Sequence, residues 1–208
     1  MHIFNRTWKA RAGKAVAAAG AAINIAEKAS AIGGQDIFAW RTAFGRPIGT
    51  MSWSMRADSQ AQLLGIGEKL EADPTFMELQ LGLAELFEGD MVDRLATVVS
   101  GTPSSTPARY VATVEATMTA GRYGDAIAFG VSMQEFIHNE LGLTSIFATD
   151  TYGGFADVIW LTGADSAADL DRLNEFQMTN TEYHERVNSA ADLFVDGSGV
   201  QGLIEKIN

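Results

Sequence analysis

Residues 53–59 read Trp-Ser-Met-Arg-Ala-Asp-Ser and residues 160–166 read Trp-Leu-Thr-Gly-Ala-Asp-Ser, and these two heptapeptides decide the fold. In each, a tryptophan in an apolar stretch is followed by the same Ala-Asp-Ser triplet, and Asp and Ser favour the first position of a helix. Tryptophan occurs only four times in the 208 residues, so a matched pair of tryptophans carries weight. We infer that the chain holds two tandem copies of one unit.

Further matches lie outward from these heptapeptides in the same order. Ile37-Phe38-Ala39 matches Ile146-Phe147-Ala148, and Ala12-Gly13-Lys14 matches Ala120-Gly121-Arg122. Residues 101–108 contain two prolines, a glycine and small polar residues, which indicates a linker because neither a helix nor a sheet tolerates that composition. We predict a first unit over residues 1–100, a linker over 101–108 and a second unit over 109–208.

Hydrophobic periodicity predicts the same order of elements in both units. In the first unit we expect strands at 3–8, 37–44 and 48–55, helices at 13–31, 58–71 and 74–88, and a closing strand at 94–99. In the second unit we expect strands at 109–119, 144–151 and 155–162, helices at 120–139, 166–177 and 181–194, and a closing strand at 200–207. This order is typical of the ferredoxin-like arrangement, in which helices cover one face of an antiparallel sheet. The predicted fold class is α+β, with two tandem ferredoxin-like units whose sheets pack into an α+β barrel.

Composition excludes several classes of protein. The net charge of −11 argues against binding to nucleic acid or to anionic membranes, since both need clustered Lys and Arg. The chain has no cysteine, which excludes disulfides, thiolate metal sites and thiol nucleophiles. The alanine-rich stretch 15–26 follows basic residues as in a signal peptide, but a predicted strand precedes it. We therefore expect an acidic cytoplasmic protein with no membrane or nucleic-acid partner.

The predicted layout resembles the dimeric α+β barrel superfamily in a fused form. Ala12-Gly13-Lys14 and Ala120-Gly121-Arg122, each between a strand and a helix, are similar to the Pro-Gly-Lys turn of NIPSNAP-like members, although neither copy has the proline. The superfamily also includes antibiotic-biosynthesis monooxygenases and stress-responsive barrel proteins. It spans enzymes, haem binders and proteins of unknown role, so the resemblance implies a fold rather than one activity.

Strand alternation sorts the side chains onto two faces of each sheet. One parity is predicted to face the helices: Phe4, Phe38, Trp40, Met51, Trp53, Val158 and Trp160. The opposite parity, predicted to face the barrel interior, mixes apolar residues with polar ones: Asn5, Thr7, Arg41, Thr50, Glu115, Asp150 and Asp157. From it we take Arg41, Thr50, Glu115, Asp150 and Asp157 as candidate ligand-binding residues. The alternative is that these charges lie at strand ends and point to water.

Three functions remain open at this point. The first is a non-catalytic small-molecule-binding protein or oligomeric scaffold, in which the small residues 15–22 allow close packing inside the protein or within a homo-oligomer. The second is a cofactor-poor enzyme (a monooxygenase, isomerase or lyase) acting on a small apolar molecule, with Asp150, Asp157 or Glu115 in catalysis and Arg41 holding negative charge. The third is a haem or metal protein with His138 or His184 as ligand. The sequence contains no strong catalytic motif, so we favour the first and predict no cofactor.

Overall fold

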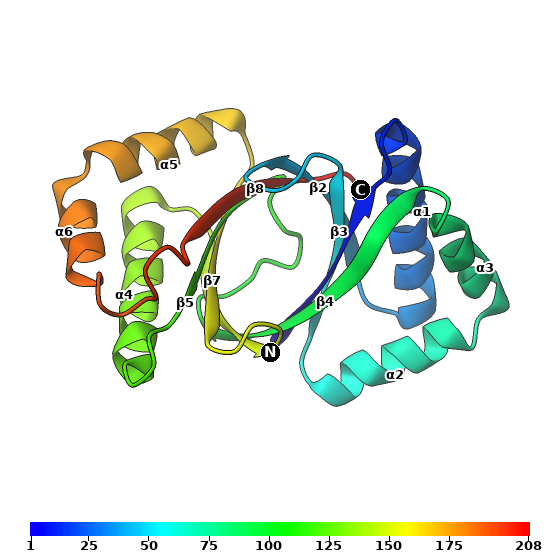
Figure 1. Cartoon of the computed structure of the whole chain (residues 1–208), viewed down its shortest axis with the longest axis horizontal. Helices are drawn as coiled ribbons and strands as arrows, with labels where there is room; N and C mark the ends of the chain where they lie inside the picture. Colours follow the sequence, from blue (N-terminus) through cyan, green and yellow to red (C-terminus); the bar gives the residue numbers. More distant parts are fainter. The chain divides into compact units, whose positions relative to one another are not determined.

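The structure, a computed structural model, describes residues 1–208. Each half of the chain runs strand, helix, strand, strand, helix, helix, strand (Figure 1). The first half consists of β1 (His2–Ala10), α1 (Ala15–Gly33), β2 (Ile37–Phe44), β3 (Thr50–Ala57), α2 (Gln60–Glu71), α3 (Pro74–Leu83) and β4 (Phe87–Ser100). The second consists of β5 (Tyr110–Thr117), α4 (Tyr123–Leu141), β6 (Ser145–Tyr152), β7 (Asp157–Ala164), α5 (Ala167–Thr179), α6 (Thr181–Ser189) and β8 (Val200–Lys206). The strands form one closed antiparallel barrel in the order β1-β3-β2-β8-β5-β7-β6-β4, which confirms the predicted fold class.

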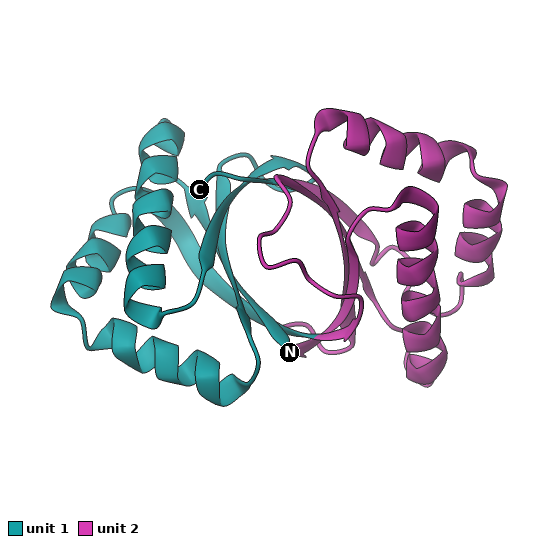
Figure 2. Cartoon of the chain, turned by 180° about the vertical axis from the view of Figure 1, so that it is seen from behind, with its two compact units in different colours: residues 1–97, 204–208 teal, residues 98–203 magenta.

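The chain divides into two compact units (Figure 2). Unit 1 contains residues 1–97 together with the C-terminal residues 204–208, and unit 2 contains residues 98–203. The C-terminal tail is held to β2 by Asn208, whose side chain accepts a hydrogen bond from Ala39 N (2.8 Å) and donates one to Ile37 O (3.1 Å). The last residues of the chain therefore complete the unit that the first residues begin.

In unit 1, α1 packs closely on the sheet because its buried surface consists mainly of alanine. Ala18, Ala22 and Ala26 are completely buried, and the indole Nε1 of Trp53 in β3 donates to the carbonyl oxygen of Ala22 at 2.9 Å. Such an approach of an indole to a helix backbone is possible only beside small residues. By length and composition α1 is the one helix that would suffice to cross a membrane, but its alanines pack against the sheet of its own unit.

Unit 2 repeats this contact with different side-chain volumes. Nε1 of Trp160 in β7 donates to the carbonyl oxygen of Gly130 in α4 at 3.0 Å. Phe147 in β6 is completely buried beneath that turn of helix, and a Cβ placed on Gly130 would lie 2.2 Å from the Phe147 ring. Glycine is therefore required at residue 130 to make room for the phenylalanine.

The helix starts also correspond between the units. Ser59 and Ser166 precede α2 and α5, and their hydroxyls accept hydrogen bonds from the backbone N–H groups three residues later, at 3.1 Å and 3.2 Å. Asp73 and Asn180 cap α3 and α6 in the same manner, each at 2.8 Å. A side-chain acceptor at this position satisfies a backbone donor that the helix leaves unbonded. The Ala-Asp-Ser triplets thus mark true helix starts.

The structure corrects the predicted match between β2 and β6 by one residue. Ala39 lies opposite Trp53 in β3, whereas Phe147 lies opposite Trp160 in β7, so Phe147 and not Ala148 is the counterpart of Ala39. A shift of one residue moves every side chain of a strand to the other face. Trp40 and Phe38 therefore lie on the face away from Trp53, and the prediction that they face the helices is wrong.

Two predicted helices are too long. The stretch 74–88 ends as a helix at Leu83, and β4 begins at Phe87, earlier than the predicted strand at 94–99. The reason is tertiary: Phe87 pairs with Ala10 in β1, is 1% exposed, and stacks on Trp8 with ring centroids 5.0 Å apart. In unit 2, α6 ends at Ser189 rather than at residue 194.

Candidate functional site

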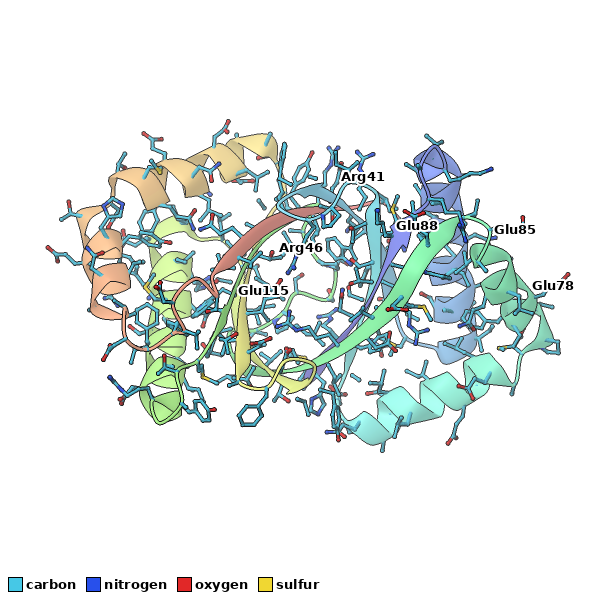
Figure 3. The ribbon with its side chains drawn as sticks, viewed as in Figure 1. Arg41, Arg46, Glu78, Glu85, Glu88 and Glu115 are labelled. Atoms are coloured by element: carbon cyan, nitrogen blue, oxygen red, sulfur yellow. The ribbon has the colours of Figure 1, made fainter.

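Two of the predicted site residues, Glu115 and Asp157, lie in unit 2 on the sheet face that its helices do not cover. Glu115 in β5 is opposite Ile159, and Thr117 is opposite Asp157 in β7, so these side chains share one face. The Thr117 hydroxyl donates to Asp157 Oδ1 at 2.6 Å. Figure 3 shows the Glu115 side chain extending from β5. The predicted face is confirmed for this part of the set.

Asp150 and Asp157 flank the hairpin that joins β6 to β7, and both carboxylates contact the turn. Asp150 Oδ2 accepts a hydrogen bond from Gly154 N at 3.2 Å. The Asp157 carboxylate lies so close to Gly154 that an added Cβ would be 1.7 Å from Oδ2. Asp150 is therefore in part a turn-forming residue, because Asp side chains commonly bond to nearby backbone amides in turns.

Arg41 lies on the other face of its sheet from the one predicted. It is opposite Met51, which belongs to the helix-packed core of unit 1. Its Nη2 is 2.6 Å from Oε2 of Glu205, and the Arg41 side chain is 55% exposed. The predicted equivalence with Asp150 is wrong, because the corrected register makes Thr149 its counterpart. Arg41 is a partly exposed ion-pair residue at the position labelled in Figure 3.

Thr50 is on the expected face, opposite Lys9 in β1, but its hydroxyl is occupied by the neighbouring turn. Its Oγ1 donates to the carbonyl oxygen of Pro47 at 2.7 Å. This bond closes the β2–β3 connection, so the hydroxyl has a structural role there.

A polar group that sequence reasoning identified only in part lies on the helix-free face of unit 1. We use this name for the face that carries Asn5, Thr7, Trp40, Ser52 and Ser54. Asn5 is opposite Ser54, Thr7 is opposite Ser52, and Ser52 is also opposite Trp40. Trp40 and Ser52 are buried, with exposed fractions of 3% and 8%. The alternation of Ser52 and Ser54 with Met51, Trp53 and Met55 indicates this face in the sequence. Trp40 was assigned to the other face because the match between β2 and β6 was one residue out.

Two hydrogen bonds organise this group. Thr7 Oγ1 donates to Asn5 Oδ1 at 2.9 Å, and Trp40 Nε1 donates to Ser54 Oγ at 2.8 Å. In these bonds the side-chain oxygens of Asn5 and Ser54 act as acceptors. The Nδ2 hydrogens of Asn5 and the hydroxyl hydrogen of Ser54 are therefore still available as donors.

Basic side chains share the face with these donors. Arg94 in β4 is opposite Asn5, and its Nη2 atom is buried. Arg56 in β3 is opposite Ile3, and Nζ of Lys206 lies 5.6 Å from the centroid of the Phe38 ring. By contrast, Arg6 lies on the helix side of the same sheet, where its hydrogen bonds to Asp93 raise the pKa of its guanidinium.

The two histidines proposed as haem or metal ligands are bonded to backbone carbonyl groups. His138 Nδ1 is 2.8 Å from the carbonyl oxygen of Leu143, just beyond the end of α4, and His184 Nε2 is 2.8 Å from that of Gln177. His184 thereby bonds a carbonyl group in the last turn of α5, and His138 bonds the chain just after the end of α4. No group of three or more His, Asp or Glu residues is arranged to hold a metal ion.

Comparison with known proteins shows the fold. No protein-family model matches the chain, and no curated protein matches its sequence. Among solved structures, a proposed monooxygenase from Fusobacterium nucleatum aligns over 100% of this chain and 93% of its own, with a TM-score of 0.74 and 9% identity. An anthrone oxidase-like protein aligns over 100% of this chain and 91% of its own, with a TM-score of 0.64 and 13% identity.

Half of the chain also aligns with 92% of a NIPSNAP family protein from Agrobacterium tumefaciens, at 17% identity and a TM-score of 0.39, a likeness too low to carry an argument. The full-length alignments agree with the predicted α+β barrel fold. At these identities they show the fold alone, since one fold supports many activities.

Proposed function

We propose that this chain is a small-molecule-binding protein, and that its ligand lies against the helix-free face of unit 1. The observation that carries the proposal is the hydrogen-bonded group formed by Asn5, Thr7 and Ser54 beside the buried indole of Trp40. Ligand sites are lined mainly by apolar and aromatic side chains with a few polar groups that orient the ligand, and this face carries residues of both kinds.

Binding without catalysis is favoured by the chemistry of these residues. The polar group consists of an amide, hydroxyls and an indole, and its charged neighbours, Arg56 and Arg94, are basic. None of these groups serves readily as a general base at neutral pH, because amides and hydroxyls do not ionise there and guanidinium groups stay protonated. The group can therefore orient and hold a ligand but has no obvious means to remove a proton from it.

Native mass spectrometry of the chain purified from its own cells tests the proposal. We expect a discrete added mass that is lost on denaturation, and we expect Ser54→Ala and Trp40→Leu to reduce its occupancy. Arg41→Gln is the matched control, because Arg41 lies on the other face and should leave occupancy unchanged. The same spectra report whether the chain forms the homo-oligomer that we also propose. A protein without added mass whose variants behave identically would support an oligomeric scaffold instead.

A cofactor-poor oxygenase is the second candidate, and the Thr117–Asp157 hydrogen bond in unit 2 favours it, because it positions a carboxylate that could act as a base. The descriptions of two proteins with this fold suggest a substrate to try. Anthrone and O2 give anthraquinone and water, so oxygen uptake should equal anthrone consumed. Uptake that exceeds the buffer rate and is lost in Asp157→Asn would establish the enzyme, whereas uptake equal to buffer would reject it for this substrate.

A further inference from the structure

The hydrogen-bond directions on the helix-free face of unit 1 indicate what kind of ligand fits it. Asn5 Oδ1 accepts from Thr7, and Ser54 Oγ accepts from Trp40. Each bond uses one of the two lone pairs of its acceptor oxygen and leaves the N–H hydrogens of Asn5 and the O–H hydrogen of Ser54 for a further partner. A ligand rich in acceptor atoms would satisfy those donors, whereas a ligand rich in donors would not.

The charge of the same face points the same way. In a chain with a net charge of −11, this face carries Arg56, Arg94 and Lys206. Lys9 lies on the same face, with its ammonium group 3.1 Å from Glu88, which is directly opposite in β4. Guanidinium groups bind carboxylates through paired, charge-assisted hydrogen bonds, which are about twice as strong as neutral ones.

The corresponding face of unit 2 has the opposite character. The corrected register makes Ala148 the counterpart of Trp40, while Ile159 and Leu161 replace Ser52 and Ser54. Glu115 replaces Thr7, so that an anion placed there would meet a carboxylate instead of a hydroxyl. The duplication has therefore kept the donor-rich arrangement in one unit only.

We propose that the ligand is an anion, such as a carboxylate, and that each chain binds one molecule through unit 1. This inference rests on the function proposed above and adds to it the charge of the ligand and the number bound. The acidic group is placed near Arg94, Asn5 and Ser54, which are only partly buried.

Equilibrium dialysis of the full chain with two isosteric probes, 2-naphthoate and neutral 2-naphthamide, tests the inference. We expect 2-naphthoate to bind at least about tenfold more tightly, the usual value of one charge-assisted hydrogen bond, and with one equivalent per chain. Arg94→Gln should weaken 2-naphthoate by about tenfold and 2-naphthamide much less. Arg6→Gln, which removes a basic group from the other face of the same sheet, should change neither affinity.

Each outcome separates the two proposals. Equal binding of the two probes, still weakened by Trp40→Leu, would overturn the anion inference and leave the binding function in place. Two equivalents of 2-naphthoate per chain would overturn the assignment to unit 1 alone. Binding of neither probe, together with no added mass in the native protein, would overturn both. Because the comparison of probes needs only the unmodified chain, a variant that fails to fold does not affect the test.

Discussion

Replacing Gly130 by alanine should destabilise the protein, although alanine is the better helix former. The added Cβ would lie 2.2 Å, 2.4 Å and 2.5 Å from three atoms of the Phe147 ring. Because carbon atoms normally approach to about 3.5–4.0 Å, the ring must move by roughly 1.5 Å. Phe147 is completely buried, and its ring centroid is 4.9 Å from that of Trp160, so the movement is opposed.

The size of the effect follows from two opposing terms. Overpacking a core costs about 1–3 kcal/mol, and the upper end applies here because the ring is enclosed. Alanine in place of glycine inside a helix stabilises the helix by about 1 kcal/mol. The net loss in the free energy of unfolding should be about 2 kcal/mol, which for a chain of this size lowers Tm by roughly 4–8 °C.

Urea unfolding and thermal melts followed by circular dichroism measure this loss. Gly20→Ala in α1 is the matched control, because that glycine has nothing within 4 Å of an added Cβ, and it should stabilise by up to about 1 kcal/mol. The reasoning is refuted if Gly130→Ala is as stable as the original chain while Gly20→Ala shows its gain.

A second variant tests the cause. Unit 1 has Ala22 and Ala39 at the positions of Gly130 and Phe147, so Gly130→Ala with Phe147→Ala reproduces a pair that the fold already accommodates. Phe147→Ala alone should cost about 3–5 kcal/mol. In a chain that already carries Gly130→Ala, the Phe147→Ala substitution should cost about 1–3 kcal/mol less than it does alone, because removing the ring also removes the clash.

Three further predictions concern the caps and the site. The hydrogen bond from Thr75 is the main reason that the pKa of Asp73 lies below its ordinary value. The ionised Asp73 carboxylate therefore stabilises the fold at pH values above its ordinary pKa, and this stabilisation disappears as the pH falls through the lowered pKa. Asp73→Asn should flatten the acid limb of a Tm–pH profile. Ser166→Ala should lower the free energy of unfolding by about 1 kcal/mol in urea titrations, because it removes a capping box with Asp169; an unchanged midpoint would contradict this. Arg41→Gln should leave the affinity for 2-naphthoate unchanged in dialysis, and a tenfold loss would return this residue to the site.

Local chemistry allowed much of the fold to be predicted. The Ala-Asp-Ser triplets are followed by capped helices at Ser59 and Ser166, and the glycines after α1 and α4 adopt the left-handed conformation that ends a helix. Caps and periodicity depend on neighbours in the sequence, so a single sequence is enough to reveal them. The order of elements, and with it the α+β barrel class, follows from these signals.

The candidate site was predicted less completely, because a face depends on register. Glu115 and Asp157 were placed correctly, since β5 and β7 pair as the alternation suggests. Arg41 and Trp40 were placed on the wrong faces because the match of Ile37-Phe38-Ala39 to Ile146-Phe147-Ala148 was one residue out. A match between short apolar stretches does not distinguish two registers that differ by one residue, yet these registers exchange the two faces.

The duplication, the class of fold, the helix starts and the acidic charge all follow from composition or from residues close together in the chain. The side of β2 that faces α1 depends instead on tertiary packing, because the indole of Trp53 fits beside Ala22 only when the small residue Ala39 lies opposite it in β2. That packing turns Trp40 toward Ser52 and Ser54, and so brings together a polar group whose members lie far apart in the sequence.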